Sequence, residues 1–130
     1  MMITKPSLKG DRIQSFTHLH AWQQAHVFVL QINKCTGEFP QQETFGLTSQ
    51  MRRAAVSITS NIAEGFRKRT LKEKRQFFTT SMASLTEVQN QLLIGKDLSY
   101  IASKDFTAIA NQSVRVSKLI QGLIRGLSKL

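Results

Sequence analysis

The final quarter of the chain holds the sequence pattern that most limits its fold. Seven apolar or small residues recur there at intervals of three and four without a break, and this spacing places them on one face of an α-helix. They are Phe106, Ile109, Ser113, Val116, Ile120, Leu123 and Leu127. The pattern predicts a long helix that starts at Ser103 as its N-cap and buries one face against other helices.

The first half of the chain repeats the helical period twice. Apolar spacing predicts one helix from His18 to about Thr36 and a second over about 44–64. Gly37 follows the first helix and stops it. Gly65 follows the second, and we expect it to adopt the left-handed conformation that comes after a helix C-cap.

A third predicted helix runs from Leu71 to about Leu98, behind a capping box in which Thr70 caps the amide of Glu73. No strand alternation is found. Four amphipathic helices with short links predict an all-α, antiparallel up-down-up-down four-helix bundle over 16–130, after a flexible N-terminal tail over 1–15. The predicted core is Trp22, Met51, Ile58, Met82, Leu85, Ile109, Val116 and Ile120.

The chain is strongly basic, and this restricts its partners. Its 130 residues include 18 Lys and Arg against 8 Asp and Glu, a formal net charge of +10. Such an excess predicts a polyanionic partner such as nucleic acid, an acidic protein or an anionic surface. No apolar run approaches the ~20 residues that span a bilayer, and the N-terminal stretch lacks the apolar run of a secretory signal. We therefore expect a cytoplasmic protein that does not enter membranes.

The motifs of common enzyme classes are missing from the sequence. There is no Gly-rich phosphate loop and no GxSxG turn, and the histidines His18, His20 and His26 lack metal-ligand spacing. The single cysteine, Cys35, has no base near it in sequence and is interpreted as a packed, inert thiol. We expect no enzymatic activity, no cofactor and no metal.

The segment 66–75 concentrates positive charge, with six basic residues and one acid. Lys72, Lys74 and Arg75 fall in the first turns of the third predicted helix, where the helix dipole repels cations. Stability alone does not account for them, and a polyanion would satisfy them. The alternative is a solvated corner. The predicted nucleic-acid-binding residues are Arg52, Arg53, Arg67, Lys68, Arg69, Lys72, Lys74 and Arg75.

Glu87 offers a structural partner to two of these arginines. In an antiparallel pair of helices it lies within about one turn of Arg52 and Arg53, so either arginine can form an ion pair with it. The two arginines therefore either join the nucleic-acid surface or are held by Glu87.

Apolar residues cover more of the predicted helices than a single core needs. Val27–Leu30 surround one turn of the first helix, and Phe77 with Phe78 and Leu92 with Leu93 lie on adjoining faces of the third. Another subunit covers part of this surface, or the core is unusually broad.

Five motifs between Phe16 and Tyr100 resemble a known family. They are Phe16-x-x-Leu19-x-x-Trp22, Phe39-Pro40-x-x-Glu43-x-Phe45-Gly46-Leu47, Gln50-x-Arg52-Arg53-Ala54-Ala55-x-Ser57-Ile58, Asn61-Ile62-Ala63-Glu64-Gly65 and Ser84-x-x-Glu87-x-x-x-Gln91-Leu92. The chain resembles the bacterial four-helix-bundle family encoded in intervening sequences of large-subunit ribosomal RNA genes. That family is similar to the accessory variability determinant proteins of diversity-generating retroelements.

The resemblance implies a basic homopentamer without catalytic residues, with RNA and a reverse transcriptase as partners. Together with the charge pattern, it predicts a homo-oligomeric accessory protein that contacts RNA or DNA phosphates. The alternative is a structural oligomer whose positive charge only provides solubility. An RNA-processing enzyme is disfavoured because no acid-base constellation is visible.

Overall fold

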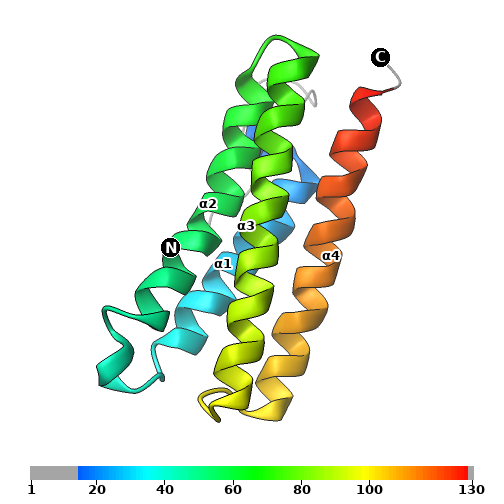
Figure 1. The fold of residues 1–130 in the computed structure, drawn as a ribbon. Coiled ribbons are helices and arrows are strands. Elements are labelled where there is room, and N and C mark those ends of the chain that lie inside the picture. The colour runs from blue at the N-terminus through cyan, green and yellow to red at the C-terminus, as the bar shows by residue number, and fades with distance from the viewer. Residues whose placement is uncertain (1–14, 129–130) are drawn as a thin grey trace.

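Four long helices form an antiparallel up-down-up-down bundle, which confirms the predicted fold (Figure 1). The computed structural model describes residues 15–128, and within them there is no strand. Short 3-10 turns at Phe16–His18 and Gln41–Glu43 precede the first and second helices. The helices are α1 (His20–Thr36), α2 (Leu47–Arg67), α3 (Leu71–Asp97) and α4 (Ser103–Leu127). The tail predicted over 1–15 lies outside the described residues, apart from Ser15.

The two ends of the bundle carry different links. One end holds the α2–α3 link and the C-terminus of α4, and the other holds the α1–α2 and α3–α4 links (Figure 1). At the first end Arg75 of α3 donates a hydrogen bond of 3.1 Å to the Ser128 hydroxyl, just beyond α4. The charged residues and the cavities described below are located relative to these two ends.

Local capping sets where the helices start. The predicted capping box is formed: the Thr70 hydroxyl accepts a hydrogen bond of 3.1 Å from the Glu73 amide and donates one of 2.9 Å to its carboxylate. Helix α4 begins at Ser103 itself, with Ala102 at the N-cap, so the predicted cap is displaced by one residue. A shift of one residue in a helix start is expected, because tertiary packing contributes more to the stability of a helix than its side-chain cap does.

The prediction that Gly65 follows the end of α2 is wrong. Gly65 lies within the helix, which continues to Arg67. It is buried, and a Cβ atom added to it would lie 2.6 Å from the ring of Phe78. The glycine is therefore required by the close approach of α2 and α3 and not by a left-handed turn.

The core follows the predicted seams. Seven of the eight predicted core residues are buried, and Met82 is half-buried against the same cluster. Of the surplus apolar residues, Phe28, Val29 and Leu92 enter the core, whereas Leu30 and Leu93 stay about half exposed. A broad core therefore accounts for part of the apolar excess, and the rest stays exposed in the single chain. No helix in residues 15–128 is long and apolar enough to cross a membrane.

Candidate nucleic-acid interface

The α2–α3 link forms a corner that presents four exposed cations. Arg67 closes α2, Arg69 lies in the link, and Lys72 and Arg75 lie in the first turns of α3. Only Arg75 of these four has a hydrogen-bond partner in the described chain, the exposed Ser128 hydroxyl. We call Arg67, Arg69, Lys72 and Arg75 the basic corner.

Lys74, from the same predicted set, has a structural role. Its ammonium group donates hydrogen bonds of 2.8 Å to the Phe66 carbonyl and 3.3 Å to the Gly65 carbonyl. These are among the last carbonyls of α2, which have no partner within the helix. The expectation that stability does not account for Lys74 is therefore corrected: it caps the helix that precedes its own.

Lys68 is also partly occupied within the chain. Its ammonium lies 3.9 Å from the Glu64 carboxylate and 5.0 Å from the centre of the Phe77 ring. An ion pair this exposed contributes little to stability. Lys68 therefore belongs to the edge of the basic corner.

Arg52 lies elsewhere and holds a different helix end. Its Nε donates a hydrogen bond of 2.8 Å to the Thr36 hydroxyl, and its Nη2 donates one of 3.1 Å to the Asn33 carbonyl. Thr36 is buried and ends α1. Arg52 is thus a C-cap for α1, supplied by α2.

The predicted ion pair with Glu87 is not formed by either arginine. The one ion pair in residues 15–128 joins Glu64 to Lys68. Glu87 instead accepts a hydrogen bond of 3.3 Å from Gln91, while exposed Arg53 lines a cavity of about 480 Å³ together with Glu87. Both arginines also lie roughly 20 Å along α2 from Arg67, at the helical rise per residue, so they do not join the basic corner.

Charge is segregated between the two ends of the bundle. Among the described residues, the end with the α2–α3 link has seven cations and two carboxylates: Arg67, Lys68, Arg69, Lys72, Lys74, Arg75 and Arg125 against Glu64 and Glu73. The opposite end is balanced, with Lys34, Arg52, Arg53, Lys96 and Lys104 against Glu38, Glu43, Glu87, Asp97 and Asp105. The surplus charge therefore produces a local positive potential at one end.

The groups considered for chemistry are dispersed. No cluster of three or more His, Cys, Asp or Glu side chains suited to a metal occurs in residues 15–128. His26 stacks on Trp22, with ring centres 4.8 Å apart. Burial, aided by the Asp105 and Glu38 carboxylates, raises the pKa of the Cys35 thiol to about 11. The thiol is therefore protonated and weakly nucleophilic at neutral pH.

Two features of the surface are not predicted from the sequence. Phe45, between α1 and α2, is 96% exposed, and a cavity of about 430 Å³ lies between α1 and α4. The Phe45-Gly46-Leu47 motif can be recognised in the sequence, but helical periodicity does not predict whether a residue in a link is buried or exposed.

Comparison with known proteins gives one family match. The family model for the 23S rRNA-intervening sequence protein matches residues 17–122. A similar solved structure is a protein of unknown function from the S23 ribosomal protein family of Bacteroides thetaiotaomicron VPI-5482, with a TM-score of 0.74. It is 21% identical, and the alignment covers 81% of this chain and 95% of that one, which shows a shared fold. The curated proteins include no match.

Proposed function

Since the chain belongs to the 23S rRNA-intervening sequence protein family, we propose that it is a non-catalytic, homo-oligomeric protein that binds RNA through its phosphates. The basic corner supplies the contacts. A homopentamer and a reverse transcriptase partner are finer parts of this proposal, and the resemblance described above supports them.

The position of the exposed cations carries the proposal. Lys72 and Arg75 lie in the first turns of α3, where the positive end of the helix dipole opposes them. Arg67 and Arg69 approach from the end of α2 and the link. An RNA backbone compensates this repulsion because its phosphates are negatively charged, and each phosphate that a lysine or arginine neutralises releases condensed counterions.

Few groups at the corner can read bases. Phe66 and Phe77 are half-buried and lie beneath Lys74 and Lys68. Stacking of bases on free aromatic rings is therefore a minor contribution, and we expect binding to depend on backbone phosphates more than on sequence.

A charge-reversal pair tests the proposal. The variant Arg69→Glu with Lys72→Glu changes two exposed cations that have no hydrogen bond in the described chain. Its matched control, Lys96→Glu with Lys104→Glu, makes the same change in net charge at the opposite end. We expect the corner variant to bind a structured RNA more weakly, with a slope of log affinity against log salt smaller by about two or more, and the control to bind like the wild type.

The readout must separate binding from folding and from assembly. Circular dichroism and light scattering verify that both variants keep the helical fold and the wild-type mass. If the corner variant bound RNA as tightly as the control variant and the wild type, the alternative would be favoured: a structural oligomer whose charge only provides solubility. Duplex DNA of equal length, titrated in parallel, shows whether the phosphate contacts distinguish RNA from DNA.

A further inference from the structure

Phe45 is an exposed aromatic side chain on a rigid support. The turn that carries it is fixed by Glu43, whose carboxylate accepts a hydrogen bond of 3.1 Å from the Leu47 amide and one of 2.9 Å from the Tyr100 hydroxyl. A backbone hydrogen bond of 2.9 Å from the Gly46 amide to the Glu43 carbonyl closes the turn. The ring is 96% exposed, so contact with a partner would remove a large apolar area from water. Because the turn is already fixed, little conformational entropy would be lost on binding.

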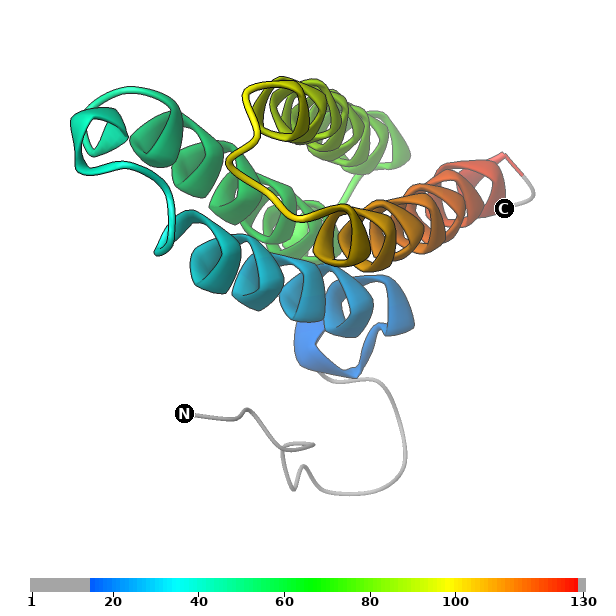
Figure 2. The ribbon, with the colours of Figure 1, turned by 90° about the horizontal axis from the view of Figure 1, so that it is seen from below.

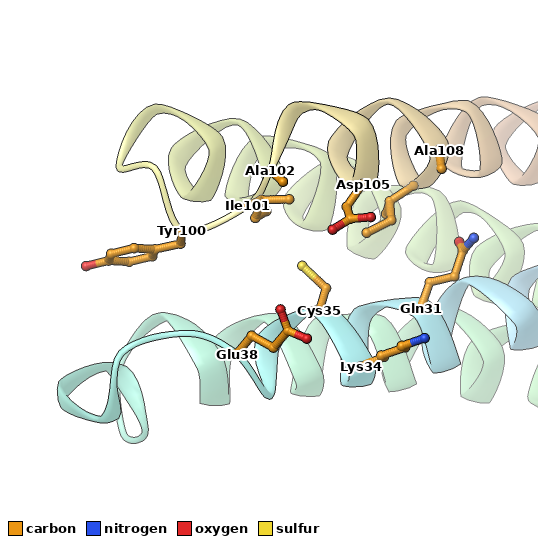
Figure 3. A pocket seen from close by; sticks show the side chains of 10 residues that line it. Gln31, Lys34, Cys35, Glu38, Tyr100, Ile101, Ala102, Asp105 and Ala108 are labelled. Carbon is orange, nitrogen blue, oxygen red and sulfur yellow. The ribbon is translucent and has the colours of Figure 1, made fainter.

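The α1–α4 cavity can receive such a ring. Its volume is about 430 Å³, which exceeds the size of a phenyl group, and its apolar lining is Tyr100, Ile101, Ala102, Ala108 and Ile109 (Figure 3). The Cys35 side chain points from α1 toward α4 into this space. Val27, one helical turn before the lining residue Gln31, is 42% exposed and extends the apolar wall along α1.

A cation without an ion pair lies beside the ring, and carboxylates outnumber cations around the α1–α4 cavity. Arg53, which lines the same α2–α3 cavity as Phe45, is exposed and has no ion pair or hydrogen bond in the described chain. Glu87 lines that cavity too, but it accepts a hydrogen bond from Gln91 and does not pair with Arg53.

Glu38 and Asp105 line the α1–α4 cavity, on either side of Cys35, and likewise form no ion pair among the described residues (Figure 3). Lys34 also lines this cavity, so its charged lining is one cation against two carboxylates, which is net negative. An aromatic ring with a neighbouring cation therefore suits this cavity.

The two features lie at one end of the bundle but on different sides. Phe45 lines the α2–α3 cavity and not the α1–α4 cavity of its own chain, and in Figure 2 the α1–α2 link projects away from α4. A rotation about an axis parallel to the bundle keeps every residue at the same height. Such a rotation can place copies side by side so that the ring of one chain faces the cavity of the next, which is a head-to-tail contact.

We infer that Phe45 of one chain inserts into the α1–α4 cavity of a second copy, with Arg53 facing Glu38 and Asp105 of that copy. The occupant of the cavity is therefore this protein itself. Repetition of the contact builds a ring when the rotation closes. The inference deepens the oligomer of the proposed function and does not depend on RNA binding.

The first experiment removes the ring. Phe45→Ala costs no core packing, because the side chain is exposed in the single chain, and the folded mass is measured by light scattering over a range of concentrations. We expect self-association at least about tenfold weaker than in the wild type, as for a central aromatic contact. Val114→Ala, which removes a 47% exposed side chain outside the cavity, should leave the mass unchanged.

The second experiment traps the contact through the chain's single cysteine. A tagged variant with Phe45→Cys and Cys35→Ser is mixed with wild-type chains, and an added copper–phenanthroline oxidant removes two electrons and two protons from each pair of thiols. We expect disulfides that join tagged to untagged chains, because each such pair has one thiol at position 45 and one in the cavity. Disulfides between like chains only would contradict the inference.

The third experiment reverses the charges. Arg53→Glu should weaken assembly, and Asp105→Arg in the same chain should restore it because the attractive pair is rebuilt with opposite signs. A wild-type chain that is monomeric at tens of micromolar, or a Phe45→Ala variant of wild-type mass, would overturn the inference and leave the cavity to another occupant. RNA affinity is measured separately on the same samples, so loss of RNA binding with intact assembly rejects the proposed function alone.

Discussion

The Tyr100 hydroxyl donates a hydrogen bond of 2.9 Å to the Glu43 carboxylate and so joins two links that are 57 residues apart. The other carboxylate oxygen accepts from the Leu47 amide at the start of α2. The rings of Phe39 and Tyr100 pack beside this bond, with centres 5.3 Å apart. One carboxylate thus fixes the α1–α2 turn, starts α2 and anchors the α3–α4 link.

Replacing Tyr100 by Phe should lower the free energy of unfolding at neutral pH, because Glu43 loses a donor. The hydrogen bond to Glu43 raises the pKa of Tyr100 above its usual 10.0. Its stabilisation is therefore complete below pH 10 and is lost as pH rises through the raised pKa. Urea titrations at increasing pH should show wild type and variant converging in alkali. Equal midpoints at neutral pH would refute the role given to this bond.

Replacing Arg52 by Ala should destabilise the protein by about 1–3 kcal/mol, since the Thr36 hydroxyl and the Asn33 carbonyl lose their charged donor. Arg52→Lys keeps the charge but not the fork and should recover only part of the loss. The neighbouring substitution Arg53→Lys is the control. The midpoint temperature of thermal unfolding, which is the measurement for all three variants, should be the same for this control as for the wild type.

Replacing Gly65 by Ala should cost about 1–3 kcal/mol, because the new methyl group would lie 2.6 Å from the Phe78 ring between two packed helices. Gly126→Ala is the matched control in α4, where an added Cβ meets nothing within 4 Å. There the helix propensity of Ala should raise stability by up to about 1 kcal/mol. Denaturant midpoints that moved equally for both variants would mean that Gly65 is not needed for the α2–α3 contact.

Alkylation of Cys35 by iodoacetamide should be slow at neutral pH. A pKa near 11 instead of the usual 9.0 leaves about a hundredfold less thiolate than an unperturbed cysteine has. The rate should rise with pH toward a midpoint near 11 in the folded protein and near the usual value in urea. A folded-state midpoint at or below 9 would show that burial and the two carboxylates do not control this thiol.

The interior of the fold could be predicted because its signal is local. The three-four spacing that ends at Leu127 and the Thr70 capping box depend on residues a few positions apart, and both reappear in the structure. Four amphipathic faces have few ways to bury themselves together, so the bundle follows from the helices. The spacing of apolar residues does not show whether a second helix of the same chain or another subunit covers them, so the surplus apolar residues were consistent with either a broad core or an interface.

By itself, the sequence determined the helices, the bundle, nearly all of the core and the excess of positive charge near the α2–α3 link. The tertiary structure decided which cations are free. Lys74 and Arg52 each cap a helix other than their own, and Gly65 makes room for a ring on α3. Such partners are set by where helix ends meet in space, which local periodicity does not encode, because it fixes the face of a residue but not its neighbour across the bundle.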